Sequence, residues 1–242
     1  MSGHSKWANI RRKKEKTDAQ KGKAFTRIGR EIVVAVKHGG PDPNSNARLR
    51  DAIASAKAVN MPNENIMRSI KKAAGESDNV NYEEVFYEGY GPGGTAVIVQ
   101  AYTENRNRTG SDIRHCFDRF GGNLGAVGCV AWMFNKEGVI TIENSQEIDE
   151  ELLMMAAIDA GAQDFTAEDE YFEILTQPND FSAVRDALEQ KGYIFASAGI
   201  EMIPSTTIKI EQEKVEKMEK FLDLLDEYDD VQNVWHNWEQ DE

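Results

Sequence analysis

The sequence predicts an α+β protein in which an N-terminal bundle of three helices precedes two domains that combine helices with strands. Two patterns support this expectation. Apolar residues recur at three- and four-residue intervals within residues 18–74, which is the spacing of one helix face, and they alternate in short runs after residue 80, as in strands. Glycine- and proline-containing stretches at residues 39–43 and 89–94 separate these runs.

Residues 1–74 are expected to form a basic arm and a helical bundle. Residues 1–22 contain few large apolar side chains, so this arm is expected to stay mobile. The first helix spans about residues 18–38, the second follows the turn at residues 42–44, and the third begins at Pro62 and stops before Gly75. Three short amphipathic helices bury their apolar faces by packing together.

The remaining chain is expected to form two ferredoxin-like α+β domains, one inserted in the other. Residues 75–130 contain a strand hairpin and a helix, and residues 131–204 follow the order βαββαβ, which is typical of a ferredoxin-like domain. Residues 205–242 provide a strand at 206–210, a helix and a last strand, too few elements to fold alone. We therefore expect residues 75–130 and 205–242 to form one discontinuous domain, with residues 131–204 as an acidic insertion.

The net charge of −14 over 242 residues conceals two segments of opposite sign. Residues 1–74 carry 17 lysines and arginines against 6 acids, a net charge of +11, whereas residues 75–242 carry 11 against 36, a net charge of −25. Such asymmetry indicates contact with nucleic acid or an acidic membrane surface through the basic part. The longest apolar run, residues 126–134, is too short to span a membrane.

The candidate nucleic-acid-binding residues of the basic segment are cations that we expect to have no acidic partners nearby, together with one tryptophan. Phosphate contacts through such cations give affinity that falls with salt, although a merely solvated charged segment is the alternative. Trp7 is expected either to stack on an unpaired base or to pack back on the helical bundle. These candidates are Lys6, Trp7, Arg11, Arg12, Lys13, Lys14, Lys16, Lys21, Lys23, Arg27 and Arg30.

A second basic cluster contains Arg106 and Arg108 at a predicted strand-to-helix junction. Free backbone N–H groups and the two guanidinium groups of such a junction can hold a phosphate. Capping of the helix by Asn107 or Thr109, with internal salt bridges to the surplus acids, is the alternative.

The stretch Gly89-Tyr90-Gly91-Pro92-Gly93-Gly94 matches the GxGxxG pattern of dinucleotide-binding proteins. That pattern requires a helix after the glycines, whereas a strand is predicted here. We therefore expect a hairpin turn in which glycines adopt positive φ. Gly91, Pro92, Gly93 and Gly94 are a weaker candidate for a loop that touches a partner.

The sequence does not favour an enzyme. It lacks the GxSxG, HExxH, Walker A and CxxC patterns, and its four histidines are scattered. Two cysteines, Cys116 and Cys129, are too few for a disulfide framework or a four-ligand zinc site and suggest reduced thiols in the cytosol. We expect no catalytic residues, no metal, no cofactor, no small-molecule substrate and no membrane partner.

Several strings occur together in this chain and resemble the YebC/PmpR family. They are GHSKWANI from Gly3, KGKAFTRIGREI from Lys21, NMPNENIMRSIKKAAGE from Asn60, YEGYGPGGTAVIVQAYTENRNRT from Tyr87 and FGGNLG from Phe120. The resemblance implies a helical first domain followed by two α+β domains and a cytoplasmic regulator of gene expression that binds nucleic acid. Mitochondrial members of that family include a translational activator of a cytochrome oxidase subunit.

Three functions remain open on these grounds. The first is a DNA-binding transcriptional regulator, and the second is a ribosome-associated translation factor that binds ribosomal RNA and helps translation of proline-rich stretches. Possible partners are therefore DNA or ribosomal RNA, with the ribosome or the transcription machinery. The third is a protein-interaction scaffold, whose activity would not depend on the basic arm.

Overall fold

The computed structural model describes residues 18–75, 81–145 and 147–239, with the side chains of residues 18–21 left undescribed. The chain forms two compact units. The larger unit contains the described residues up to Phe134 and those from Pro204 onward, and the inserted unit contains residues 135–203. The three-domain division of the chain stays a prediction.

Three helices open the larger unit, namely α2 (Asp18–Gly39), α3 (Ala47–Ala58) and α4 (Asn63–Ala74). Their apolar faces meet in a core that contains Ile32, Leu49 and Ile66. Buried Asn46 caps α3 by accepting a 3.0 Å hydrogen bond from the Leu49 N–H, and its amide donates to the carbonyls of Ala35 and Gly40 at 2.8 Å. One asparagine therefore fixes the turn between the first two helices.

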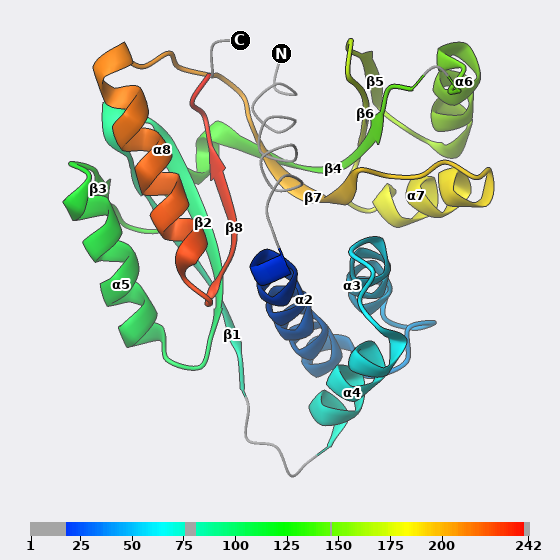
Figure 1. Cartoon of the computed structure of the whole chain (residues 1–242), viewed down its shortest axis with the longest axis horizontal. Coiled ribbons are helices and arrows are strands. Elements are labelled where there is room, and N and C mark those ends of the chain that lie inside the picture. The colour runs from blue at the N-terminus through cyan, green and yellow to red at the C-terminus, as the bar shows by residue number, and fades with distance from the viewer. Residues whose placement is uncertain (1–17, 76–80, 146, 240–242) are drawn as a thin grey trace. The chain divides into compact units, whose positions relative to one another are not determined.

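The same unit contains a four-stranded sheet with the order β3-β1-β2-β8 (Figure 1). Its strands are β1 (Glu83–Tyr90), β2 (Ala96–Thr103), β3 (Asn123–Leu124) and β8 (Val231–His236), and each neighbouring pair is antiparallel. Two helices, α5 (Arg106–Arg119) and α8 (Gln212–Glu227), pack on it. Phe117 of α5 and Phe221 of α8 meet edge to face, 4.9 Å between ring centroids. The C-terminal strand thus joins the hairpin that begins the sheet.

The inserted unit has the strand order of a ferredoxin-like domain. Its elements are β4 (Phe134–Glu143), α6 (Glu150–Ala160), β5 (Asp164–Ala167), β6 (Tyr171–Thr176), α7 (Phe181–Gln190) and β7 (Ser197–Pro204), in the sheet order β5-β6-β4-β7. Ile140 and Phe172 on the strands pack against Leu153 and Phe181 on the helices. The α+β fold, with its N-terminal helical region, is confirmed.

Two local expectations differ from the structure. The predicted strand at residues 206–210 is reduced to one parallel bridge between Ile208 and Trp238. Residues 131–204, which were expected to open with a strand, begin instead with a 3₁₀ turn at residues 131–133, and the strand starts at Phe134. In both places an apolar run indicated β structure, but periodicity alone does not show whether a neighbouring strand is available for pairing.

Gly89 is expected to tolerate no side chain, because an added Cβ would overlap the Asn123 carbonyl oxygen and lie 2.8 Å from the Phe117 ring. Gly89→Ala should therefore lower the free energy of unfolding by about 1–3 kcal/mol, measured by urea denaturation. Gly22→Ala is the matched control, since an added Cβ there meets nothing within 4 Å and alanine favours the helix. Equal stability of the two variants would contradict the close approach of β1 and β3.

Candidate nucleic-acid interface

The predicted binding residues fall into two groups. Those of the arm, Lys6, Trp7, Arg11, Arg12, Lys13, Lys14 and Lys16, lie outside the described residues, as does the side chain of Lys21. The others belong to the larger unit. Lys23, Arg27 and Arg30 lie on α2, Arg106 and Arg108 begin α5, and Gly91, Pro92, Gly93 and Gly94 connect β1 to β2.

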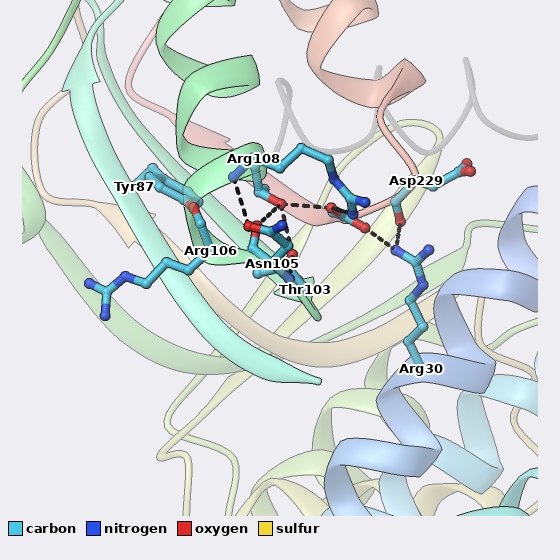
Figure 2. Close-up of polar contacts among 9 residues, drawn as sticks. Arg30, Tyr87, Thr103, Asn105, Arg106, Arg108 and Asp229 are labelled. Carbon is cyan, nitrogen blue, oxygen red and sulfur yellow. Dashed lines mark hydrogen bonds and ion pairs between the residues drawn. The ribbon is translucent and has the colours of Figure 1, made fainter. Parts of the chain in front are cut away.

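The Asp230 carboxylate brings together two cations, Arg30 from α2 and Arg108 from α5. Figure 2 shows both arginines. One oxygen accepts from Arg30 Nη1 at 2.9 Å, and the other accepts from Arg108 Nη2 at 3.1 Å and from Thr109 Oγ1 at 2.7 Å. Arg30 also donates to the backbone carbonyl of Asp229. We call Arg30, Arg108, Thr109 and Asp230 the Asp230 cluster.

The start of α5 is built to present Arg108 and Thr109 to this carboxylate. Asn105 caps the helix by accepting from the Arg108 N–H at 3.1 Å, and its own N–H donates to Thr103 Oγ1 at 2.9 Å. The capping residue is therefore Asn105, and not Asn107 or Thr109 as the sequence suggested. The internal salt bridge proposed as the alternative for this basic cluster is present at Arg108.

The pKa of Asp230 is set by opposing effects. Burial raises it, but hydrogen bonds from Thr109 and Arg108 and the positive charge of Arg30 outweigh burial and hold the pKa below its usual range. The carboxylate therefore stays ionised at neutral pH and neutralises Arg30 of the basic segment together with Arg108 of α5.

The expectation that Arg27 and Arg30 lack acidic partners is wrong. Arg27 Nη1 pairs with Asp226 Oδ1 at 2.9 Å, and its Nη2 donates to the Asp226 carbonyl at 2.7 Å. The partners of these arginines lie 199 and 200 residues further along the chain. Sequence neighbourhood gives no sign of a contact at that separation. Two predicted phosphate ligands thus attach α2 to the C-terminal segment.

Arg48, a further cation of the basic segment, is also used internally. Its guanidinium group donates to both Glu84 oxygens, at 3.1 and 3.0 Å, and to the Tyr102 hydroxyl at 2.7 Å. Glu31 lies near this pair. Burial, with smaller effects of Asp51 and Glu84, raises the pKa of Glu31 to about 7 against the opposing effect of Arg48. The helices therefore contact the sheet through a polar, partly titratable surface.

Other predicted residues remain directed to solvent. Arg106 is exposed and points away from the Asp230 cluster in Figure 2, while its backbone carbonyl accepts a 3.3 Å hydrogen bond from the Tyr87 hydroxyl. Lys23 is partly exposed, and burial together with neighbouring Arg27 lowers the pKa of its ammonium group despite nearby Asp226. The Arg106 side chain is therefore accessible to solvent, whereas Lys23 is partly enclosed.

The glycine-rich loop is a turn with the expected positive φ at Gly93 and Gly94, 77° and 80°. Pro92 is buried, and a Cβ on Gly93 would overlap Ile210. Gly91 also has no room for a side chain, since a Cβ there would lie 2.8 Å from Thr95 Oγ1. Only Gly94 has open space beside it. Most of this loop is therefore packed against its own unit.

Three exposed cations on α4, which sequence reasoning did not select, form a basic surface. Arg68, Lys71 and Lys72 are exposed and lie opposite the buried residues Ile66 and Ile70. Their spacing of three and four residues places them on one side of the helix. The 4.0 Å approach of Arg68 to the exposed Glu64 contributes little. We call these three cations the α4 basic face. The sequence does contain a signal for this surface, because the three cations fall on the side of the helical repeat opposite the apolar residues.

Comparison with known proteins identifies the family. A model described as the TACO1/YebC N-terminal domain matches residues 5–76, and a model of the TACO1/YebC second and third domain matches residues 82–238. This chain belongs to the TACO1/YebC family.

Curated relatives of this TACO1/YebC protein are named probable transcriptional regulatory proteins. One from Acetivibrio thermocellus is 66% identical over 88% of each chain, and one from Ruminiclostridium cellulolyticum is 60% identical over 100% of this chain and 98% of its own. The crystal structure of a conserved hypothetical protein from Aquifex aeolicus has 48% identity and a TM-score of 0.85, covering 94% of this chain and 93% of that one. The sequence resemblance to YebC/PmpR proteins is confirmed.

Two kinds of feature are absent from the described part of the TACO1/YebC protein. Within residues 18–75, 81–145 and 147–239, no cluster of three histidines, cysteines or acids is arranged to hold a metal. No helix in these same ranges has the length and apolar character of a membrane span.

Replacing Asp230 is expected to weaken the folded state. Asp230→Asn removes the charge that Arg30 and Arg108 share, which should lower the free energy of unfolding by about 1–3 kcal/mol at neutral pH. Because the folded pKa is depressed, the contribution of Asp230 is present above its unfolded pKa of about 3.9 and is lost as pH falls through the folded pKa. Urea denaturation at several pH values measures this difference.

Asp229→Asn is the matched control for this prediction. Arg30 uses the Asp229 backbone carbonyl, which the substitution preserves, and the Asp229 side chain is directed away from the cluster in Figure 2. An equal loss of stability in both variants would show that total charge, and not the Asp230 cluster, is responsible.

Proposed function

We propose that this protein is a cytoplasmic, non-catalytic regulator of gene expression that binds nucleic acid through its basic N-terminal part. The observation that carries this proposal is the α4 basic face, where Arg68, Lys71 and Lys72 are exposed on one side of a helix. The curated relatives, named as transcriptional regulatory proteins, support a regulatory role. The arm cations from Lys6 to Lys16 would contribute further phosphate contacts.

The exposed and the paired cations have different parts in this proposal. A cation that neutralises a phosphate releases condensed counterions, whereas one already paired with a carboxylate gains less from that exchange. Arg27, Arg30 and Arg108 are paired in this way. We therefore assign phosphate contacts to Arg68 and Lys71 of the α4 basic face, Lys23, Arg106 and the arm, and a positioning role to the three paired arginines. Lys72 adds exposed positive charge on the same side of α4.

Two nucleic-acid partners are compatible with this surface. The names of the relatives favour a role in transcription, for which duplex DNA would be the partner. Lysines and arginines that contact phosphates fix position but do not read base sequence. The α4 basic face therefore also suits structured RNA, which proteins recognise largely by shape and backbone. A ribosome-associated translation factor that binds ribosomal RNA is thus the second candidate.

Crosslinking in living cells, followed by sequencing of bound DNA and bound RNA, separates these candidates. Discrete promoter peaks that are lost on combining Arg68→Glu, Lys71→Glu and Lys72→Glu would establish a transcriptional regulator. Ribosomal RNA enrichment lost in the same variant would establish a translation factor. A second variant reverses the charge of Arg11, Arg12, Lys13 and Lys14 to test the arm. Absence of both signals in the unaltered protein would favour a protein-interaction scaffold.

The α4 basic face is expected to determine the salt dependence of binding in vitro. Reversing its three charges should reduce the slope of log K against log salt by about 2–3 if each cation meets one phosphate, and weaken different sequences by the same factor. The matched control is the combination Lys214→Glu, Lys217→Glu and Lys220→Glu on α8, which changes net charge equally on a helix rich in acids. If the control reduces the slope as much, the α4 basic face is not the contact surface.

Loss of a paired arginine is expected to have a different effect. Arg30→Ala should lower the melting temperature while leaving the salt slope of the folded protein unchanged, because its guanidinium group serves Asp229 and Asp230. A reduced slope at unchanged stability would reassign Arg30 to the phosphate contacts.

A further inference from the structure

Helix α6 of the inserted unit is apolar on two sides, although only one side is buried. Leu153, Ala156 and Ala157 pack into the core of the unit. On the opposite side, Leu152, Met155 and Ile158 expose 60%, 58% and 58% of their surface. Packing on a sheet requires one apolar face only. Exposed apolar residues that form a continuous patch, unlike scattered ones, mark an interaction surface.

Acidic residues surround this second apolar side. Glu151 and Asp159 lie four residues before and after Met155, which places them on the same side of the helix. Between Lys136 and Arg185 the sequence contains thirteen aspartates and glutamates and no lysine, arginine or histidine. The apolar side of α6 therefore lies within a long segment of uniformly negative charge.

We propose that Leu152, Met155 and Ile158, with Glu151 and Asp159, form a docking surface for a basic amphipathic helix of a partner protein. We call it the α6 docking face. The apolar side chains suit the apolar side of such a helix at helical spacing. Methionine adapts its shape to the side chains that it meets. Lysines or arginines at the border of the partner helix pair with the acids, which gives a faster encounter and a preferred orientation.

The charge of this region disfavours a nucleic acid as the occupant. A phosphate backbone brought to α6 would meet Glu151 and Asp159 without a cation from residues 137–184 to offset them. A second copy of α6 would place the same acids opposite one another, at a similar electrostatic cost. A basic protein segment is the partner class that satisfies both the apolar and the acidic parts of the face.

The full chain can be tested with a synthetic amphipathic helix of leucine and lysine, about 18 residues long. Fluorescence anisotropy should show binding that weakens with salt. Combining Met155→Gln and Ile158→Gln should weaken it by about tenfold or more, since central apolar contacts carry most of the energy of such interfaces. Combining Glu151→Gln and Asp159→Asn should reduce the salt dependence.

The matched control is Ile194→Gln in the same unit, because this isoleucine is 85% exposed and lies outside α6. It should bind the peptide as the unaltered chain does. Glutamine is a good helix former, so the α6 variants should keep the melting temperature.

Several results would overturn the proposal. The first is that a leucine–glutamate peptide binds as tightly as the leucine–lysine peptide. The second is that Ile194→Gln weakens peptide binding as much as the α6 variant does. The third is self-association or RNA binding of the unaltered chain that disappears on combining Met155→Gln and Ile158→Gln. Unchanged nucleic-acid affinity in that variant is expected, so the α6 docking face and the nucleic-acid interface are tested separately.

Discussion

The Asp230 carboxylate joins three segments that are distant in the sequence. It accepts hydrogen bonds from Arg30 on α2 and from Arg108 and Thr109 on α5, and it lies one residue before β8. Because β8 pairs with β2, this contact connects the helices to the sheet at the point where the C-terminal segment enters it. The structure of the larger unit therefore depends on a residue near the end of the chain.

The positive charge of the N-terminal segment serves two physical purposes. Arg27, Arg30 and Arg48 are partly buried and paired with carboxylates, where removal of one partner would leave a charge without compensation. Arg68 and Lys71 are exposed on α4 and keep their long-range field. The net charge of the segment therefore overstates what is offered to phosphates, since part of it is neutralised within the protein.

The segregation of charge along the chain also distinguishes the two units. In our proposals, cations of the larger unit attract a polyanion, whereas the acids of the inserted unit repel it and attract basic protein segments. In our proposals, nucleic acid meets α4 and a basic partner helix meets α6. A protein of this kind would connect a nucleic acid to a protein partner without catalysing a reaction, which suits a regulator of gene expression.

The sequence by itself determined the features that depend on near neighbours. Helical spacing predicted α2, α3 and α4, the order βαββαβ predicted the ferredoxin-like inserted unit, and the glycines at 93 and 94 predicted positive φ in the hairpin turn. Tertiary structure alone decided which cations of α2 are paired with carboxylates. The partners of Arg27 and Arg30 are 199 and 200 residues away, and local periodicity contains no information about pairs at that distance.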